Sequence, residues 1–339
     1  MTSPDPPRRI ALVKLGAMGD CVNILPFVNR LRAGYREAEI VWIIGREAHS
    51  LLKGHPAVDR FVVVDKSKPW SWRAPARELR REGVDLAIDL QRILKSAWLL
   101  RCLRARRSLG FDRARSKELS WLGPKEHIAP NAQPGVTVAQ YLEFADHLEL
   151  PDQAPTWNLD VGKVPKFGNP ERPRVALNLG ASKPANHWPA ERWHELAALL
   201  IARTDAQVIL CGGPTDRAVA VEVASGLPAK RFENFVGVLS WKDTAAMLGA
   251  VNLLIAGDTG PLHVAVAVGT PVLALFGAAD PQRTGPFERP GSVFSRPAPC
   301  SPCRRKTCNV EGHPCMTQIH PRELCEEAQQ CLDRLAKST

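Results

Sequence analysis

The stretch RIALVKLGAMGD, residues 9–20, decides the fold. A short apolar run ends in a glycine-containing loop, and a helical pattern follows over residues 20–35. Strands buried in parallel sheets are short, continuous apolar runs of this kind, and helices connect them. The stretch therefore predicts the first strand, loop and helix of an α/β fold.

The same alternation continues to both sides of a proline-rich stretch. Residues 151–173 contain five prolines, which is typical of a linker. The strands predicted before it cover residues 9–15, 38–45, 60–65 and 84–90, and the helices 74–82, 92–107 and 136–148. The strands predicted after it cover residues 174–180, 206–213, 251–257 and 270–277. The helices there cover 191–203, a segment ending at 225, 242–250 and 315–337. This pattern predicts two doubly wound, Rossmann-like domains, residues 1–160 and 161–339, that face each other across a cleft.

Composition excludes several classes of protein. The chain has 339 residues, of which 45% are hydrophobic and 24% charged, as in ordinary globular proteins. Nine cysteines are too sparse for a disulfide-stapled mini-protein. Apolar runs are too short for a membrane span, and Lys14 interrupts the first one, unlike in a signal peptide. We expect a soluble, cytoplasmic protein with reduced thiols.

The positive charge is concentrated in one stretch. The net charge is +10, and residues 66–125 alone contain 16 Lys or Arg against 6 Asp or Glu. Such a stretch favours a partner with clustered negative charge: nucleic acid, an anionic membrane face or a phosphorylated substrate. The alternatives are a solvated basic surface without a ligand and, for the arginines of residues 101–107, cations that complement a helix C-terminus.

Two loops that follow predicted strands carry candidate catalytic and binding residues, because ligands of open α/β sheets bind beyond the carboxyl ends of the strands. In Gly16–Asp20, two glycines allow a tight turn, and Asp20 is either a cleft-facing carboxylate or the helix N-cap. In Gly257–His263, the helix start, Thr259 and His263 suit phosphate oxygens, whereas Asp258 suits a ribose or the loop itself. An N-cap with a core histidine is the alternative.

A third loop and a cysteine cluster complete the candidates. Ser182 and Lys183 follow the first strand of the second half, where a hydroxyl and an ammonium suit a phosphate, although an ordinary polar loop has the same composition. Four cysteines lie within 16 residues and predict a structural zinc or iron site, with reduced thiols or a redox pair as alternatives. These are Cys300, Cys303, Cys308 and Cys315.

Together these motifs resemble glycosyltransferase family 9, the bacterial heptosyltransferases of lipopolysaccharide core assembly. The resemblance rests on VKLGAMGD (13–20), GASK and HWP (180–189), GDTGPLH through LFG (257–277), and Asp280-Pro281. The pattern CSPCRRKTC in residues 300–308 is similar to members related to the second core heptosyltransferase. Family members commonly have a lysine close before the Trp-Pro pair, where this chain has Asn186.

The resemblance implies a GT-B fold and inverting transfer from ADP-L-glycero-D-manno-heptose to the lipopolysaccharide inner core, at Kdo or the first heptose. It implies Asp20 as general base. The N-terminal domain would bind the acceptor and the C-terminal domain the nucleotide sugar. The residues implied to hold the donor diphosphate are Ser182, Lys183, Asp258, Thr259, Gly260 and His263.

We expect no metal requirement for catalysis, because no carboxylates cluster to hold Mg²⁺. The expected acceptor is anionic, the expected location is the cytoplasm with peripheral contact at the inner membrane, and no nucleic acid partner is expected. Three other hypotheses remain: a family member with another acceptor such as protein hydroxyls, a GT-B epimerase or hydrolase, and a basic nucleic-acid-binding protein with a four-cysteine metal site.

Overall fold

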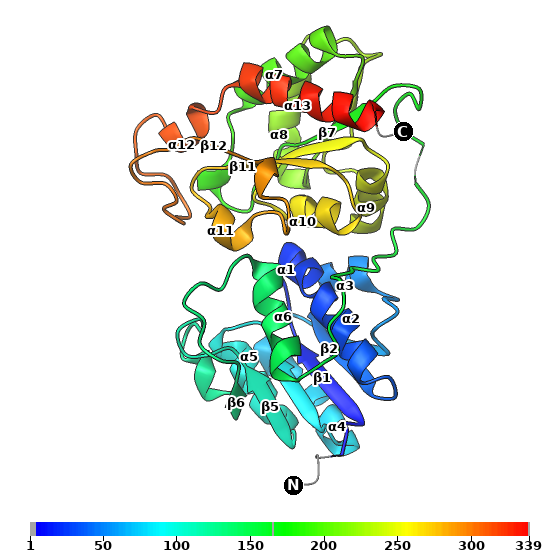
Figure 1. Cartoon of the computed structure of the whole chain (residues 1–339), viewed down its shortest axis with the longest axis vertical. Helices are drawn as coiled ribbons and strands as arrows, with labels where there is room; N and C mark the ends of the chain where they lie inside the picture. Colours follow the sequence, from blue (N-terminus) through cyan, green and yellow to red (C-terminus); the bar gives the residue numbers. More distant parts are fainter. Residues whose placement is uncertain (1–4, 165, 338–339) are drawn as a thin grey trace. The chain divides into compact units, whose positions relative to one another are not determined.

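The computed structural model describes residues 5–164 and 166–337. The chain forms two compact units, Met1–Asp160 and Val161–Thr339, each built on one six-stranded sheet (Figure 1). All neighbouring strands are parallel, so the predicted α/β fold is confirmed. The described residues of the proline-rich stretch contain neither helix nor strand, and Pro165 lies outside them.

The sheet of the N-terminal unit has the order β3-β2-β1-β4-β5-β6. Its strands are β1 (Arg9–Val13), β2 (Glu39–Gly45), β3 (Arg60–Val64), β4 (Leu86–Asp89), β5 (Arg107–Gly110) and β6 (Glu126–His127). Its helices are α1 (Met18–Asn23), α2 (Leu25–Gly34), α3 (Arg46–Leu52), α4 (Arg73–Glu82), α5 (Leu94–Leu103) and α6 (Thr137–His147). Leu79 of α4 and Leu99 of α5 share a core cluster with Val13 and Ile43, so both helices cover the same face of this sheet.

The sheet of the C-terminal unit has the order β12-β11-β10-β7-β8-β9. Its strands are β7 (Arg174–Asn178), β8 (Gln207–Cys211), β9 (Phe232–Asn234), β10 (Leu253–Gly257), β11 (Val272–Phe276) and β12 (Val293–Ser295). Its helices are α7 (Ala190–Arg203), α8 (Arg217–Ala224), α9 (Trp241–Gly249), α10 (Gly260–Ala267), α11 (Pro281–Thr284), α12 (Pro314–Thr317) and α13 (Pro321–Ala336).

The two sheets share one topology. In each, the chain builds outward in one direction for three strands and then in the other direction for three more. The direction reverses between β1 and β4 in the first sheet and between β7 and β10 in the second. Such a switch point leaves a crevice at the carboxyl ends of its two strands, where ligands of doubly wound sheets bind.

Three predicted helices are shorter than expected. The helix predicted over residues 20–35 is two helices, α1 and α2, because Pro26 lacks an N–H and stands in the first turn of the second one. Pro321 likewise starts α13 anew after α12, which divides the helix predicted over 315–337. The helix predicted over 92–107 ends at Leu103, and Arg107 begins β5.

The other differences are elements that the sequence pattern did not predict. They include α3 and α11, and also the strands β5, β6, β9 and β12, which are short and carry polar residues. Of these strands, β6, β9 and β12 lie at sheet edges, and β5 is the neighbour of β6. Among the described residues, no helix is long and apolar enough to cross a membrane.

Candidate active site at the two switch points

Asp20 lies at the switch point of the N-terminal sheet, in the first helix after β1. Gly16 turns the chain there with a φ of +142°, a conformation that favours glycine. The N-cap of α1 is Ala17, so the interpretation of Asp20 as N-cap is wrong. The Asp20 side chain is 39% exposed, and its Oδ2 lies 3.0 Å from the Nζ of Lys14. The partly exposed carboxylate of Asp20 is thus held in place by the ammonium of Lys14.

Lys14 follows β1 directly, and its side chain is only 1% exposed. Its ammonium also donates to the hydroxyl of Tyr141 at 2.8 Å and to the carbonyl of Leu90 at 3.2 Å. Burial alone would lower the pKa of Lys14, but the charge of Asp20 and the contact with Tyr141 outweigh it and raise the pKa above its ordinary value. Lys14 therefore stays protonated, and its ammonium fixes the position of the Asp20 carboxylate.

Asp89 ends β4, the other strand of this switch point. Its carboxylate accepts hydrogen bonds from the amide of Gln91 and the hydroxyl of Ser96, both at 2.9 Å. Burial raises the pKa of Asp89 to about 6, and these hydrogen bonds oppose the rise. The Gln91 side chain accepts from the amide of Leu15 at 2.9 Å, which joins the loops after β1 and β4. This edge is therefore a network of buried polar groups.

The switch point of the C-terminal sheet brings the predicted donor residues together. Asp258 follows β10, Thr259 is the N-cap of α10 and Gly260 is its first residue. The Ser182 hydroxyl donates to the carbonyl of Asp258 at 3.2 Å, so the loops after β7 and β10 touch. The alternative interpretation of this loop is a helix N-cap with a core histidine. The N-cap of α10 is Thr259, the residue after Asp258.

The charges at this second switch point converge on Asp258. Its Oδ1 lies 3.9 Å from the Nε2 of His263, which is buried one turn into α10. Burial raises the pKa of Asp258, and the opposing contributions come from His263, a hydrogen bond from Thr284, Lys183 and Arg283. Cationic and hydroxyl groups therefore surround one loop at a helix N-terminus, an arrangement that suits phosphate oxygens.

Comparison with known proteins now decides the class. Residues 72–313, well over half of the chain, match the profile of glycosyltransferase family 9 (heptosyltransferase). The chain belongs to glycosyltransferase family 9. It is therefore a glycosyltransferase, as the resemblance implied.

Relatives of this glycosyltransferase match along most of its length. The lipopolysaccharide heptosyltransferase 1 of Pseudomonas aeruginosa is 29% identical over 89% of this chain and 88% of its own. The structure of Escherichia coli ADP-heptose lps heptosyltransferase II has a TM-score of 0.77 at 21% identity and covers 98% of this chain and 100% of that one. The E. coli heptosyltransferase WaaC, solved with ADP, has a TM-score of 0.72 at 21% identity and covers 95% and 98%. The two solved structures show that the fold is that of the GT-B heptosyltransferases.

In the glycosyltransferase, Asn186, which departs from the family pattern, lies in the loop after β7. The residue is 4% exposed, and within the described part of the chain neither its Oδ1 nor its Nδ2 has a hydrogen-bond partner. A Cβ at Gly257 would lie 3.4 Å from the Asn186 carbonyl oxygen, which places Asn186 beside the end of β10. A buried polar group without a partner costs about 1–3 kcal/mol, a cost that a bound ligand or an ordered water would remove.

The cysteine-rich segment supports the loop that carries Lys183. The sequence pattern did not predict this contact. The carbonyl of Arg304 accepts from the Lys183 ammonium at 3.3 Å, and that of Lys306 accepts from the amide of Ala185 at 3.1 Å. The His313 ring contacts the Ala185 carbonyl at 2.9 Å. These partners lie more than 100 residues apart in the chain, so no local pattern could have indicated them.

The four cysteines do not form a metal centre as placed. They are free thiols, and among the described residues no three His, Cys, Asp or Glu side chains are arranged to hold a metal ion. Burial, together with the nearby thiols of Cys300, Cys308 and Cys303, raises the pKa of Cys315 to about 11. They are near enough to interact, and a metal would have to displace a tightly held proton. The structural metal site stays a prediction.

Proposed function

We propose that this glycosyltransferase moves heptose from ADP-L-glycero-D-manno-heptose to the lipopolysaccharide inner core, at Kdo or at the first heptose. The observation that carries the proposal is its family membership together with a named lipopolysaccharide heptosyltransferase that matches 89% of the chain. The geometry agrees with it, because one switch point carries an anchored carboxylate and the other a phosphate-compatible loop.

Asp20 is the proposed general base. The acceptor hydroxyl attacks the anomeric carbon from the face opposite ADP and gives its proton to the Asp20 carboxylate. The bond from the anomeric carbon to the diphosphate oxygen breaks, and its electron pair leaves with ADP, so the configuration inverts. A positioned base contributes about 10²–10⁴-fold to such a reaction. Lys14 fixes the carboxylate through the 3.0 Å contact and so acts as a positioning residue.

The second switch point is the proposed donor site. Charge develops on ADP as it leaves, and Lys183 with the N-terminal amides of α10 would stabilise it. Ser182, Thr259 and Gly260 leave room for the phosphates and offer hydroxyl or amide donors. The Nε2 of His263 lies 3.9 Å from the Asp258 carboxylate. The unpartnered amide of Asn186 would gain a hydrogen bond from the donor in place of the lysine that other family members carry.

The proposed division of labour follows the two units. The N-terminal unit binds the anionic acceptor and the C-terminal unit binds the nucleotide sugar. Since the acceptor is a lipid in the inner membrane and the donor a cytoplasmic nucleotide sugar, we place the enzyme in the cytoplasm with peripheral contact at that membrane. We propose no catalytic metal and no nucleic acid partner.

Acceptor-dependent ADP release tests the proposal. The purified protein is incubated with ADP-heptose and a Kdo-lipid A acceptor, with and without one heptose attached. Release that requires one of the acceptors supports it, and the preferred acceptor identifies the first or the second transfer. ADP binding without release on either acceptor would contradict it and favour another acceptor, such as a protein hydroxyl.

A further inference from the structure

A cavity of about 360 Å³ is lined by residues of α4 and α5, which pack on the same face of the N-terminal sheet. Its lining includes Trp98 and five arginines, namely Arg73, Arg77, Arg80, Arg101 and Arg104. The guanidinium of Arg73 lies over the Trp98 ring at 5.7 Å, and Trp98 packs partly against the core and partly lines the cavity. No carboxylate contributes to this lining.

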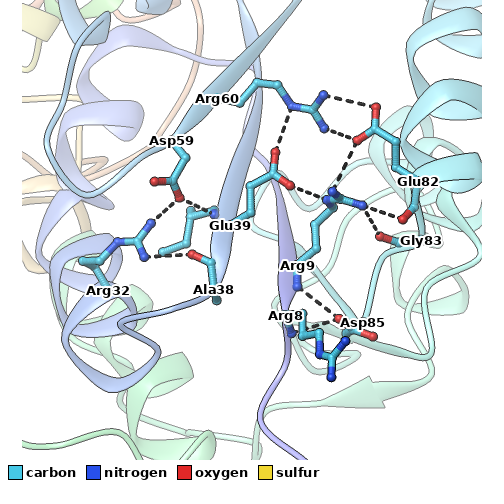
Figure 2. Close-up of polar contacts among 11 residues, drawn as sticks. Arg8, Arg9, Arg32, Ala38, Glu39, Asp59, Arg60, Glu82, Gly83 and Asp85 are labelled. Atoms are coloured by element: carbon cyan, nitrogen blue, oxygen red, sulfur yellow. Dashed lines mark hydrogen bonds and ion pairs between the residues drawn. The ribbon is translucent and has the colours of Figure 1, made fainter.

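Three acids of this unit, Glu39, Glu82 and Asp85, have partners other than these arginines. Figure 2 shows Glu39 and Glu82 paired with Arg9 and Arg60, and the Arg60–Glu82 contact is 2.5 Å long. Asp85 accepts from the backbone amide of Arg9 at 3.0 Å in the same view. Over residues 5–164 and 166–337, none of the five cavity arginines forms an ion pair. Acids thus neutralise the charges of Arg9 and Arg60, whereas the charges of the five cavity arginines are not neutralised by ion pairs.

The helix dipole explains only part of this charge. Arg80 and Arg101 lie in the last turns of α4 and α5, where cations are favoured. Arg73 and Arg77 lie in the first half of α4, where the dipole favours acids, and they follow each other at the i,i+4 spacing at which like charges repel. An arrangement that is unfavourable for the isolated helix indicates an anionic partner.

Exposed apolar side chains lie on α5 and on two short segments that contact α4 and α5. In the part of the chain that the structure describes, the exposed tryptophan and leucines are Trp70, Leu94, Leu119 and Leu122. Trp70 is 68% exposed and stands just before α4, and Leu94 is the first residue of α5. The carbonyl of Leu122 accepts from the guanidinium of Arg101 at 2.8 Å, which joins this segment to the cavity. Arginines beside exposed tryptophan and leucine are typical of a surface that lies on a bilayer.

We propose that the α4–α5 face docks on a bilayer that contains anionic phospholipids, with headgroup phosphates in the arginine cavity. The planar guanidinium group binds phosphate oxygens through two parallel hydrogen bonds. Exposed Trp70 and the leucines favour a lipid surface over a polynucleotide, which would leave them in water. The inference deepens the proposed function by giving the residues of the membrane contact, and its test uses no sugar donor, so either can fail alone.

The test is cosedimentation with phosphatidylcholine vesicles that contain or lack phosphatidylglycerol. The groove variant is Arg77→Gln, Arg80→Gln and Arg104→Asn; asparagine suits position 104, where φ is +51°. The matched control removes the same charge from exposed positions of the C-terminal unit: Lys163→Gln, Lys230→Gln and Arg322→Gln. Thermal melting shows that both variants are folded.

We expect binding only to the phosphatidylglycerol vesicles, with weaker binding as salt rises. The groove variant should bind about 100-fold more weakly, since each of three arginines near an anionic surface contributes about fivefold. The control should bind within about twofold of the parent, and both should turn over a detergent-dispersed acceptor normally. Equal loss in variant and control, binding indifferent to phosphatidylglycerol, or groove-dependent retention on DNA without vesicle binding would overturn the proposal.

Discussion

The switch points of the two sheets occupy the same place in the same strand order, but different side chains form them. The first contains a buried ammonium, Lys14, and a buried carboxylate, Asp89, with Asp20 anchored at the edge. The second contains small and hydroxyl side chains around the start of α10, with cations at its border. The shared topology provides two crevices, and the side chains give each its chemistry.

Under the proposed function, this difference follows from what each ligand requires. A general base must point in one direction, and a network of buried partners fixes that direction. A diphosphate presents many oxygens and needs backbone amides and room, which Thr259 and Gly260 at a helix start provide. The same fold therefore suits a rigid proton acceptor in one unit and an open anion cradle in the other.

We expect the largest effect from a variant that changes the first switch point alone. We expect Asp20→Asn to lower kcat by about 10²–10⁴-fold, because the amide cannot accept the acceptor's proton. The dissociation constant for ADP should stay nearly unchanged, since we assign ADP to the other switch point. ADP-release kinetics and calorimetric titration measure the two quantities.

Lys14→Met is the companion variant for Asp20. It keeps the carboxylate but removes its anchor, and kcat should fall by about tenfold to a hundredfold with the KM of the donor unchanged. Near-normal turnover of Asp20→Asn would reject Asp20 as the base. A loss of ADP binding in either variant would reject the division between the two switch points.

The second prediction concerns the buried charge of the first switch point. The pKa of Asp89 is about 6 in the folded protein against 3.8 for the ordinary group, so its contribution to stability is complete below pH 3.8 and lost as pH rises through 6. Asp89→Asn removes this dependence. Relative to the parent, the variant should gain on the order of 2–3 kcal/mol in stability between pH 4 and pH 7.5.

Unfolding midpoints of parent and variant across that pH range check the Asp89 prediction. Asparagine keeps an oxygen for the Gln91 amide and an amide for the Ser96 hydroxyl, so the shape of the network is preserved. A difference between the two proteins that is independent of pH would contradict the assigned burial of this charge.

The third prediction breaks the second switch point. We expect Thr259→Ala combined with His263→Ala to weaken ADP binding by about 10–100-fold, because hydrogen bonds to a charged group are lost. Thr215→Ala is the matched control, because Thr215 follows β8, which does not flank the switch point. Unchanged affinity in the double variant would remove this loop from the donor site.

The smallest expected effect tests the segment that supports the donor loop. If Cys300, Cys303, Cys308 and Cys315 bind a structural metal, elemental analysis should find about one zinc or iron per chain. Cys300→Ser with Cys303→Ser should remove the metal and weaken ADP binding only a few-fold, through the loop of Lys183. A folded, active protein without metal would end that prediction.

The sequence was sufficient to predict the alternation of strands and helices and the loops at both switch points. Central strands are continuous apolar runs, and glycine-rich turns follow them, so both signals are local. Edge strands such as β6 and β9 carry polar residues and lack that signal. The helix after β1 divides because Pro26 stands in the first turn of α2. The proline is evident in the sequence, but its effect depends on where the second helix begins.

The networks at the two sites could not be predicted in the same way. In the sequence, Lys14 is only a polar residue at the end of a strand. Its hydrogen-bond partner Tyr141 lies 127 residues later in the chain. The support of Lys183 by Arg304 spans 121 residues. Such contacts depend on which helix packs over which strand end, and a single sequence does not contain that information.

Hydrogen–deuterium exchange with and without ADP tests the division of labour most directly. We predict that ADP slows exchange in residues 180–188 and 257–263, while exchange in residues 14–20 stays as it is without ligand. The Asp20→Asn variant should show the same pattern. Protection centred on residues 14–20, with the two C-terminal loops unaffected, would contradict the account.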